Sequence, residues 1–363
     1  VERSRGLGDV YKRQEIYKAW AWGNYKYQSK SKKNLLYVKE QKELEFLTFY
    51  SDCINFSRDL INSPANKLNP STYYSKIKNN NLFKSFNFID YTEKEINSNF
   101  PLTCAVGKSS SSKPKVIEIT NRKLSKKDKP LVIIGKGVTF DTGGVNIKPG
   151  TSMRNMKKDM GGSAIAISLF LLANYFLKKT KIVLIAPIAE NAISSKSMRP
   201  GDVYSSVSGK SVEIAHTDAE GRLLLADAIE KASSYNPCMI IDFATLTGAA
   251  RVALGEDLPA YFCNNETFAK KIENLNKEKL RCWRLPLYSP YLFKIKSQVA
   301  DLSNASLDGM AGSITAALFL QEFLKSPNIP WFHFDTFAWS QDSKGAALQG
   351  LDIMSDFLRK NFN

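Results

Sequence analysis

Apolar and polar positions follow different periods along this chain, and each period predicts an element. Between residues 38 and 62 the apolar side chains recur at roughly helical spacing, which predicts a helix. The segment Ser63–Pro70 holds two prolines and two asparagines, so it should end this helix in a turn. Residues 71–130 mix short apolar runs with lysine-rich loops.

From residue 131 onward, short continuous apolar runs alternate with longer runs of helical period. Continuous runs of four to eight apolar residues are typical of strands buried on both faces of a sheet. The predicted strands are 131–134, 182–188, 238–244 and 331–337, and the predicted helices are 160–177, 223–235, 267–276, 313–324 and 351–362. This alternation predicts an α/β fold with helices on both faces of the sheet.

Composition narrows the class of protein. Of 363 residues, 43% are apolar, and no apolar run reaches the roughly 18 residues of a membrane span; the closest, 164–177, contains Asn174. Five widely spaced cysteines without a CxxC motif argue against a disulfide framework and for a reducing compartment. Because the chain has only two histidines, His216 and His333, a histidine-rich metal site is excluded.

The positive charge is concentrated near the N-terminus. Residues 1–130 carry 25 Lys and Arg against 13 Asp and Glu, a net charge of +12 out of the total of +16. A basic segment can attract nucleic acid or an anionic membrane. These lysines lie among asparagines and serines, as solvated loops do, and no nucleic-acid-binding motif accompanies them. We therefore expect neither nucleic acid nor a membrane as the main partner.

Residues 1–14, VERSRGLGDVYKRQ, differ in sequence pattern from the rest of the chain. They lack the apolar core and the cleavage site of a signal peptide. The run DVYKRQ resembles the translation of a common library-preparation adapter. We interpret residues 1–14 as a non-native leader before a truncated gene, an interpretation that genomic codons at this locus would contradict.

Three segments carry the candidate chemistry: GKGVTFDTGGVNIKPG at 135–150, MKKDMGG at 156–162 and HTDAEGRLLLADA at 216–228. The first follows a buried strand, and ligand sites in open α/β sheets form at strand ends. Its glycines would also suit a phosphate cradle, but GxxxxGK[ST] and GxGxxG are both absent, which weakens a nucleotide-binding interpretation.

The carboxylates of these segments are candidate metal ligands. In an extended segment Asp218 and Glu220 would lie on one side, with Arg222 in the same alternation. Taken singly, Asp159 is best read as a helix N-cap, and the others as surface salt bridges. Taken together they would be costly to bury without a counter-charge. Two divalent cations could supply that charge, bound by Asp141, Asp159, Asp218 and Glu220. Lys148 and Arg222 would remain to face substrate oxygens.

The segment HTDAEGRL closely resembles the NTDAEGRL signature of the leucyl aminopeptidases, also called cytosol aminopeptidases. GKGVTFDTGGVNIKP, DMGG, RPGD at 199–202 and ATLTGA at 244–249 match in the same order and spacing. The resemblance covers about residue 58 to the C-terminus. It implies that residues 58–363 form a three-layer α/β/α catalytic domain with a mixed, mostly parallel central sheet, of the zinc-exopeptidase or phosphorylase-like kind.

The resemblance also implies two metal ions per subunit, Zn²⁺, Mn²⁺ or Co²⁺. One ion would be held by Asp141, Asp218 and Glu220, and the other by Lys136, Asp141, Asp159 and Glu220. Lys136 would have to be neutral, and a nearby dication favours that form because it lowers the lysine's pKa.

In the mechanism that the resemblance implies, a water bridging the two ions attacks the first peptide bond. Lys148 would polarise the scissile carbonyl, and Arg222 would hold a bicarbonate ion as general base. The substrate's free α-amine would bind one ion. The backbone of Leu246 would orient the substrate, and the side-chain pocket would fall at Met156, Thr245 and Gly248.

Four aromatic or histidine positions depart from the family pattern or stand outside the ligand set. His216 replaces the signature's asparagine, which we interpret as a packing change and not as a new ligand. His333 lies in a strand-like run and is expected to be structural. Phe337 and Trp339 lie where the family has its pocket wall, so they could narrow or reshape side-chain specificity.

Relatives usually carry an N-terminal α/β domain of about 150 residues. Here residues 15–57 would be its remnant, with a linker helix. The resemblance implies a cytoplasmic homohexamer that removes leucine or other N-terminal residues from peptides, with broad preference. Two alternatives stay open: a non-catalytic relative, and a DNA-binding protein that uses the basic N-terminal third.

Overall fold

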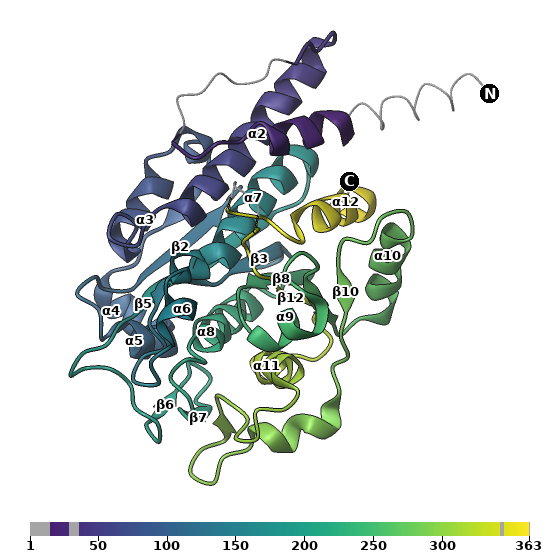
Figure 1. The fold of residues 1–363 in the computed structure, drawn as a ribbon. Helices are drawn as coiled ribbons and strands as arrows, with labels where there is room; N and C mark the ends of the chain where they lie inside the picture. Colours follow the sequence, from purple (N-terminus) through teal and green to yellow (C-terminus); the bar gives the residue numbers. More distant parts are fainter. Residues whose placement is uncertain (1–14, 29–35, 342–344, 363) are drawn as a thin grey trace.

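The computed structural model describes residues 15–28, 36–341 and 345–362, and its centre is a mixed β-sheet (Figure 1). The strand order is β1-β2-β5-β3-β8-β12-β9-β10, and β4 pairs with β5 outside this path. The strands are β1 (Asn87–Ile89), β2 (Lys115–Thr120), β3 (Leu131–Gly135), β4 (Gly137–Asp141), β5 (Ile182–Asn191), β8 (Met239–Ala244), β9 (Ala260–Cys263), β10 (Trp283–Arg284) and β12 (Trp331–Asp335). Strands β5, β3, β8 and β12 are parallel, whereas β2 and β9 run antiparallel to their neighbours β5 and β12.

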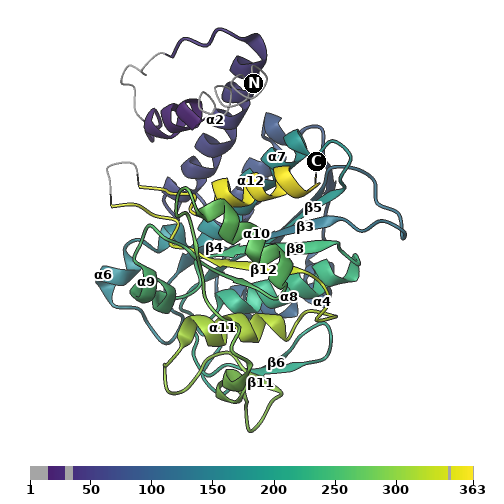
Figure 2. The ribbon, with the colours of Figure 1, turned by 90° about the vertical axis from the view of Figure 1, so that its right-hand side faces the viewer.

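Helices cover both faces of this sheet because its strands are apolar on both sides. Leu131 and Ile133 of β3 belong to the core beneath α7 (Gly161–Phe176), whereas Val132 and Ile134 belong to the core beneath α8 (Gly221–Ser234). Helices α2 (Gln41–Asn62) and α12 (Leu351–Phe362) pack on α7, and α11 (Gly312–Gln321) packs on α8 (Figure 2). Helix α5 (Pro101–Gly107) also packs on α8. The three layers and the mostly parallel sheet confirm the predicted fold class.

The remaining elements are short. They are α3 (Pro70–Lys78), α4 (Glu93–Asn99), α6 (Gly150–Met153), α9 (Gly248–Leu254), α10 (Glu266–Asn276), the 3₁₀ turns η1 (Asn81–Phe83), η2 (Met156–Met160) and η3 (Ser289–Ile295), and a three-stranded sheet of β11 (Leu302–Ser303), β7 (Ser211–Glu213) and β6 (Val203–Ser205).

Residues 71–130 hold more regular structure than their apolar runs suggest. Local capping explains part of it, since Asn69 and Thr92 each form a capping box at the start of α3 and α4. Strand β2 is buried although it contains Glu118, because it pairs along its whole length with β5. Neither signal is an apolar period, so periodicity alone misses these elements.

The N-terminal described residues pack on the same core as the sheet. Tyr17 and Ala21, from the helical residues 15–23, share a core cluster with Phe46 of α2. The Arg58 guanidinium lies 4.0 Å from the ring centroid of Tyr25. The predicted boundary between residues 57 and 58 therefore falls inside the unbroken helix α2, and the domain-remnant interpretation stays a prediction. Residues 1–14, interpreted as a leader, lie outside the described residues.

Among the described residues, one stretch, Met156–Phe176, is long and apolar enough to cross a membrane by composition. Its most apolar window is 83% buried inside the fold. This stretch comprises η2 and α7, and α7 contacts β3, β5 and β8. We therefore identify it as the central core helix.

The close packing of α7 on β8 gives a stability prediction. A Cβ added at Gly162 would lie 2.2 Å from the carbonyl oxygen of Phe243 and 2.8 Å from the Cα of Ala244, so backbone would have to shift. We expect Gly162→Ala to lower the free energy of unfolding by about 1–3 kcal/mol. Gly150→Ala is the control because a Cβ there meets open space. Urea denaturation of both variants tests this; equal stability would contradict the packing.

Candidate functional site

The predicted site residues converge at the carboxyl edge of the parallel strands. Lys136 follows β3, Asp141 ends β4, and Thr245 follows β8. Asp141 lies beside Asn191, the last residue of β5, in the register of these two strands. Parallel strands place their carboxyl ends on one side of a sheet, which brings segments together that are more than 100 residues apart in sequence.

Lys136 is buried against two carboxylates. Its Nζ lies 2.7 Å from Asp159 Oδ2 and 3.1 Å from Glu220 Oε1, and it donates a 2.8 Å hydrogen bond to the carbonyl of Thr245. Asp159 in turn accepts a 2.8 Å hydrogen bond from Thr245 Oγ1. Asp159 lies in η2 and caps no helix, since α7 begins after Met160 without a side-chain cap. The N-cap interpretation of Asp159 is therefore wrong.

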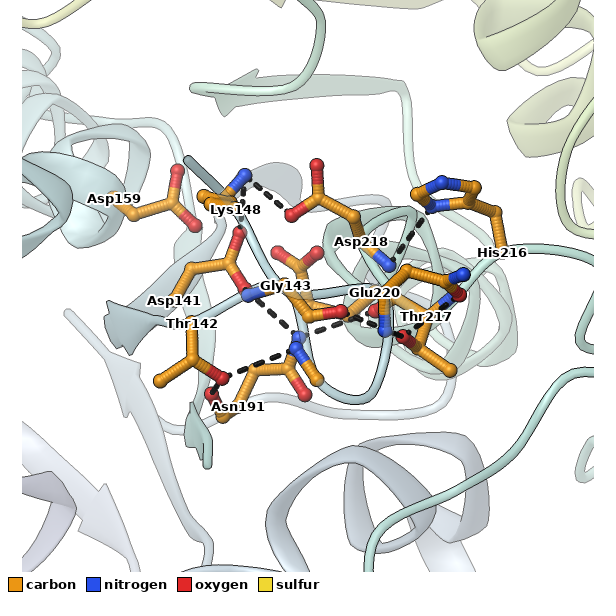
Figure 3. A network of polar contacts seen from close by, with 12 residues as sticks. Asp141, Thr142, Gly143, Lys148, Asp159, Asn191, His216, Thr217, Asp218 and Glu220 are labelled. Atoms are coloured by element: carbon orange, nitrogen blue, oxygen red, sulfur yellow. Dashed lines mark hydrogen bonds and ion pairs between the residues drawn. The ribbon is translucent and has the colours of Figure 1, made fainter. Parts of the chain in front are cut away.

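A second cation, Lys148, lies between two further carboxylates (Figure 3). Its Nζ is 2.9 Å from Asp141 Oδ2 and also forms an ion pair with Asp218 Oδ1. Asp141, Asp218 and Glu220 can each offer one oxygen such that these atoms lie within 4.8 Å of one another. The four predicted carboxylates and both lysines thus share one site.

The segment that carries Asp218 and Glu220 is a turn and not the extended segment that the alternation predicted. The amide of Ala219 donates to the carbonyl of His216, and α8 begins directly after Glu220. Arg222 lies inside the first turn of α8, so it does not continue an alternation. The carboxylates of Asp218 and Glu220 converge because the chain turns back toward the strand ends.

Two buried asparagines that sequence reasoning missed hold these loops in place. Asn191 Nδ2 donates to Asp141 Oδ1 at 2.8 Å and to the carbonyl of Thr217 at 3.1 Å. Asn304 accepts hydrogen bonds from the amides of Ala215 and His216, and it donates to the carbonyls of His216 and Ala219. A single asparagine at a strand end or in a loop carries no periodic signal, so the sequence alone could not single them out.

Burial shifts several ionisation equilibria in this chain. Burial, and then the charge of Asp141, raises the pKa of Asp218 to about 6 and that of Glu220 well above its usual range. Burial opposes the charged form of Lys136, but Asp159, Glu220 and Asp141 outweigh it and raise the pKa of Lys136. Nearby carboxylates raise the pKa of Lys148 in the same way. Without metal ions, Lys136 and Lys148 therefore stay protonated, and their positive charges offset the negative charges of the carboxylates.

Arg222 is buried, and its Nε and Nη1 have no hydrogen-bond partner among the described residues. Burial lowers the pKa of its guanidinium to about 10, which still leaves it charged at neutral pH. Nearby, buried Asp335 accepts hydrogen bonds from the amides of Leu246 and Thr247 at 3.2 and 3.1 Å. It thereby fixes the loop that also carries Thr245.

The two histidines lie in different surroundings, and the interpretation of His216 as a packing change and not a ligand stays a prediction. His216 Nδ1 accepts a hydrogen bond from the amide of Asp218 at 3.2 Å, and its ring lines the cavity described below. His333 is fully buried in β12, where its Nδ1 lies 2.5 Å from Asp242 Oδ1. Neither belongs to the oxygen cluster around Asp141.

A cavity of about 940 Å³ opens onto these groups. Its lining includes the functional groups Lys148, Asp159 and Asp218 and all four predicted substrate-binding residues, Met156, Thr245, Leu246 and Gly248. Of the two aromatic departures, Phe337 lines the cavity. Trp339 is not among the described lining residues; its ring lies 5.3 Å from Lys157 Nζ. Of these two residues, Phe337 is therefore the one expected to reshape side-chain specificity.

Comparison with known proteins assigns the family. Residues 55–354 match the model of the cytosol aminopeptidase family, catalytic domain. The chain belongs to this family. It is 37% identical to a probable cytosol aminopeptidase of Syntrophotalea carbinolica over 298 residues, which are 81% of this chain and 59% of that protein. It is 41% identical to a cytosol aminopeptidase of Encephalitozoon cuniculi over 288 residues, 77% of this chain and 58% of that protein.

Two solved structures have a fold similar to that of this chain. The crystal structure of a cytosol aminopeptidase from Coxiella burnetii superposes with a TM-score of 0.87 at 38% identity, covering 97% of this chain and 78% of that one. The bottromycin maturation enzyme BotP, in complex with Mn, gives a TM-score of 0.86 at 28% identity over 96% of this chain and 79% of that one. The chain spans about three fifths of the length of the curated aminopeptidases it matches.

The raised pKa of Asp218 predicts a pH dependence of stability. The folded chain holds this proton more tightly than the unfolded chain, so the unfolding free energy should fall as pH rises from about 4 to about 6. In chelator-treated protein we expect Asp218→Asn to reduce this fall by about 1–3 kcal/mol. Exposed Asp257→Asn is the control. Urea titrations at several pH values measure it; identical profiles would contradict the assignment.

Proposed function

We propose that this chain is a dinuclear metalloexopeptidase that hydrolyses the N-terminal residue from peptides. The observation that carries this proposal is the buried oxygen cluster of Asp141, Asp218 and Glu220 beside Asp159 and Lys136. Carboxylates packed this closely call for cations, and the cluster opens onto a cavity of peptide size. Family membership supports the same chemistry.

The residues present fit two divalent cations. Asp159 Oδ2, Asp218 Oδ1 and Glu220 Oε1 are buried and accept no hydrogen bond from any described residue, although a lysine Nζ lies near each. We propose Asp141, Asp218 and Glu220 as ligands of one ion and Lys136, Asp141, Asp159 and Glu220 as ligands of the other. Zn²⁺, Mn²⁺ and Co²⁺ suit such carboxylate-rich sites, and the related BotP is seen with Mn. Bound ions would activate a water and polarise the scissile carbonyl.

Lys136 needs to lose its proton to act as a ligand. Its nitrogen is buried and already directed at Asp159 and Glu220, so its position suits the role. A dication would repel the ammonium form and would also satisfy the carboxylates that now raise the pKa of Lys136. Metal binding should therefore release a proton from this group.

Lys148 and Arg222 remain as the catalytic cations. Lys148 lines the cavity, so its ammonium could stabilise negative charge that develops on the carbonyl oxygen during attack. Two buried nitrogen atoms of Arg222 have no hydrogen-bond partner in the described part of the chain, which would suit a bound bicarbonate that accepts the proton of the water. The carboxylates supply no free base once they bind metal, which leaves this role to the anion.

The cavity wall would position the peptide. We propose that Met156, Thr245 and Gly248 border the side chain of the first residue and that the Leu246 backbone orients the peptide, since all four residues line the cavity. Asp335 acts here as a positioning residue through its hydrogen bonds to the loop. A location in the cytosol is proposed from the names of the relatives. Leucine among other first residues and a homohexameric assembly are proposed from the resemblance of the sequence motifs.

Hydrolysis of aminoacyl-p-nitroanilides tests the function. We expect chelation to stop release of p-nitroaniline, Mn²⁺ or Zn²⁺ to restore it, and N-acetylated substrates to stay intact. Bicarbonate should increase the rate. Glu220→Gln should bind less metal and lose activity, because this carboxylate serves both ions. Full activity of Glu220→Gln would refute the site. If the unmodified chain binds metal but hydrolyses no substrate, the result would favour a non-catalytic relative.

Lys148→Met gives a separate prediction about the chemical step. Because Lys148 is not proposed as a ligand, the variant should keep its metal while kcat falls about 10²–10³-fold. Metal content is measured by atomic emission beside the kinetics. Loss of metal in proportion to activity would instead make Lys148 part of the metal site.

A further inference from the structure

The cavity has a second group of cations, which the proposed reaction does not use. Lys158 of η2 and Arg251 of α9 both line it, beside Phe337 from the loop after β12. Lys158 Nζ lies 4.4 Å from the Phe337 ring centroid, and Arg251 Cζ lies 4.9 Å from it. We call these three residues the cationic wall.

Within residues 15–28, 36–341 and 345–362, no carboxylate forms an ion pair with either cation of this wall. Lys148, by comparison, forms ion pairs with two carboxylates. Lys158 is only 5% exposed, yet neither it nor Arg251 lies within 4.0 Å of a carboxylate oxygen among the described residues. Asp159, adjacent in sequence, directs its oxygens to Lys136 and Thr245 instead.

A buried lysine without a counter-ion costs stability, and contact with an aromatic ring offsets only part of that cost. Another carboxylate of the lining, Glu256, accepts a hydrogen bond from Gln341 and forms no ion pair with Lys158 or Arg251. The charge of the wall is therefore available to a ligand in the cavity. An anion that enters would gain charge-assisted hydrogen bonds from nitrogen atoms that lack an anion now.

We propose that the cationic wall binds the carboxylate of an acidic first residue, aspartate or glutamate, in a peptide substrate. This inference rests on the proposed function. Lys158 adjoins Asp159 at the metal end of the cavity and lies two residues after Met156, in the proposed side-chain pocket. A side chain attached next to the scissile bond would meet this wall, with Phe337 packing against its methylene groups.

The kinetic test compares matched substrates. We expect kcat/KM for glutamyl-p-nitroanilide to exceed that for the isosteric glutaminyl compound about tenfold or more. Lys158→Met and, separately, Arg251→Met should each reduce this ratio several-fold. Arg251 is exposed, so its variant should fold even if the buried Lys158 variant does not. Arg154→Met is the control, since it removes an exposed cation of the same segment outside the cavity lining and should leave the ratio unchanged.

Two further arms separate the possible failures. Calorimetry can compare the affinities for free glutamate and free glutamine without any turnover. Equal affinities would overturn the proposed role of the cationic wall even if the chain hydrolyses nothing. Hydrolysis of leucyl and glutaminyl but not glutamyl substrates would keep the proposed function and overturn only the wall. The enzyme could instead prefer leucyl-alanine over leucyl-alanine amide while showing no preference between the two nitroanilides. In that case the cationic wall binds the C-terminal carboxylate of the peptide, and the side-chain assignment is overturned.

Discussion

The burial of many charges at one sheet edge is the constraint on which the rest of this structure depends. Each of these carboxylates and lysines alone would destabilise the fold at such depth, because desolvation disfavours the charged form. They are tolerated because they are interleaved: Lys136 lies between Asp159 and Glu220, and Lys148 between Asp141 and Asp218. The arrangement works only if every loop that carries a charge is held in register with the others.

The fold supplies that register through buried polar side chains that pair with backbone. Asn191 ties the end of β4 to the turn before α8, Asn304 ties that turn to β11, and Asp335 fixes the loop after β8. Each of them replaces the hydrogen bonds that loops lose when they leave a sheet. The glycine at 162 serves the same end, since it lets α7, which begins just after Asp159, approach β8 closely.

The charged residues of the site could be predicted from the sequence, but the residues that hold them in place could not. The parallel strands could be located because strands buried on both faces form continuous apolar runs. The charged residues clustered next to those strands then indicated the site. The turn at Asp218 was predicted as extended because spacing of two residues fits either geometry. Asn191, Asn304 and the wall formed by Lys158 and Arg251 depend on contacts between distant segments, which no local pattern records.

The cavity presents two differently balanced groups of charges close together. Around Lys136 and Lys148 the lysines are paired with carboxylates, a set that attracts cations such as metal ions or a substrate's ammonium group. Lys158, next to Asp159 in sequence, and Arg251 form no ion pair within the part of the chain that the structure describes, so they attract a carboxylate. A zwitterionic ligand could meet both groups at once, and their opposite preferences would orient it. The charges that the fold leaves without a partner thus indicate what the cavity binds.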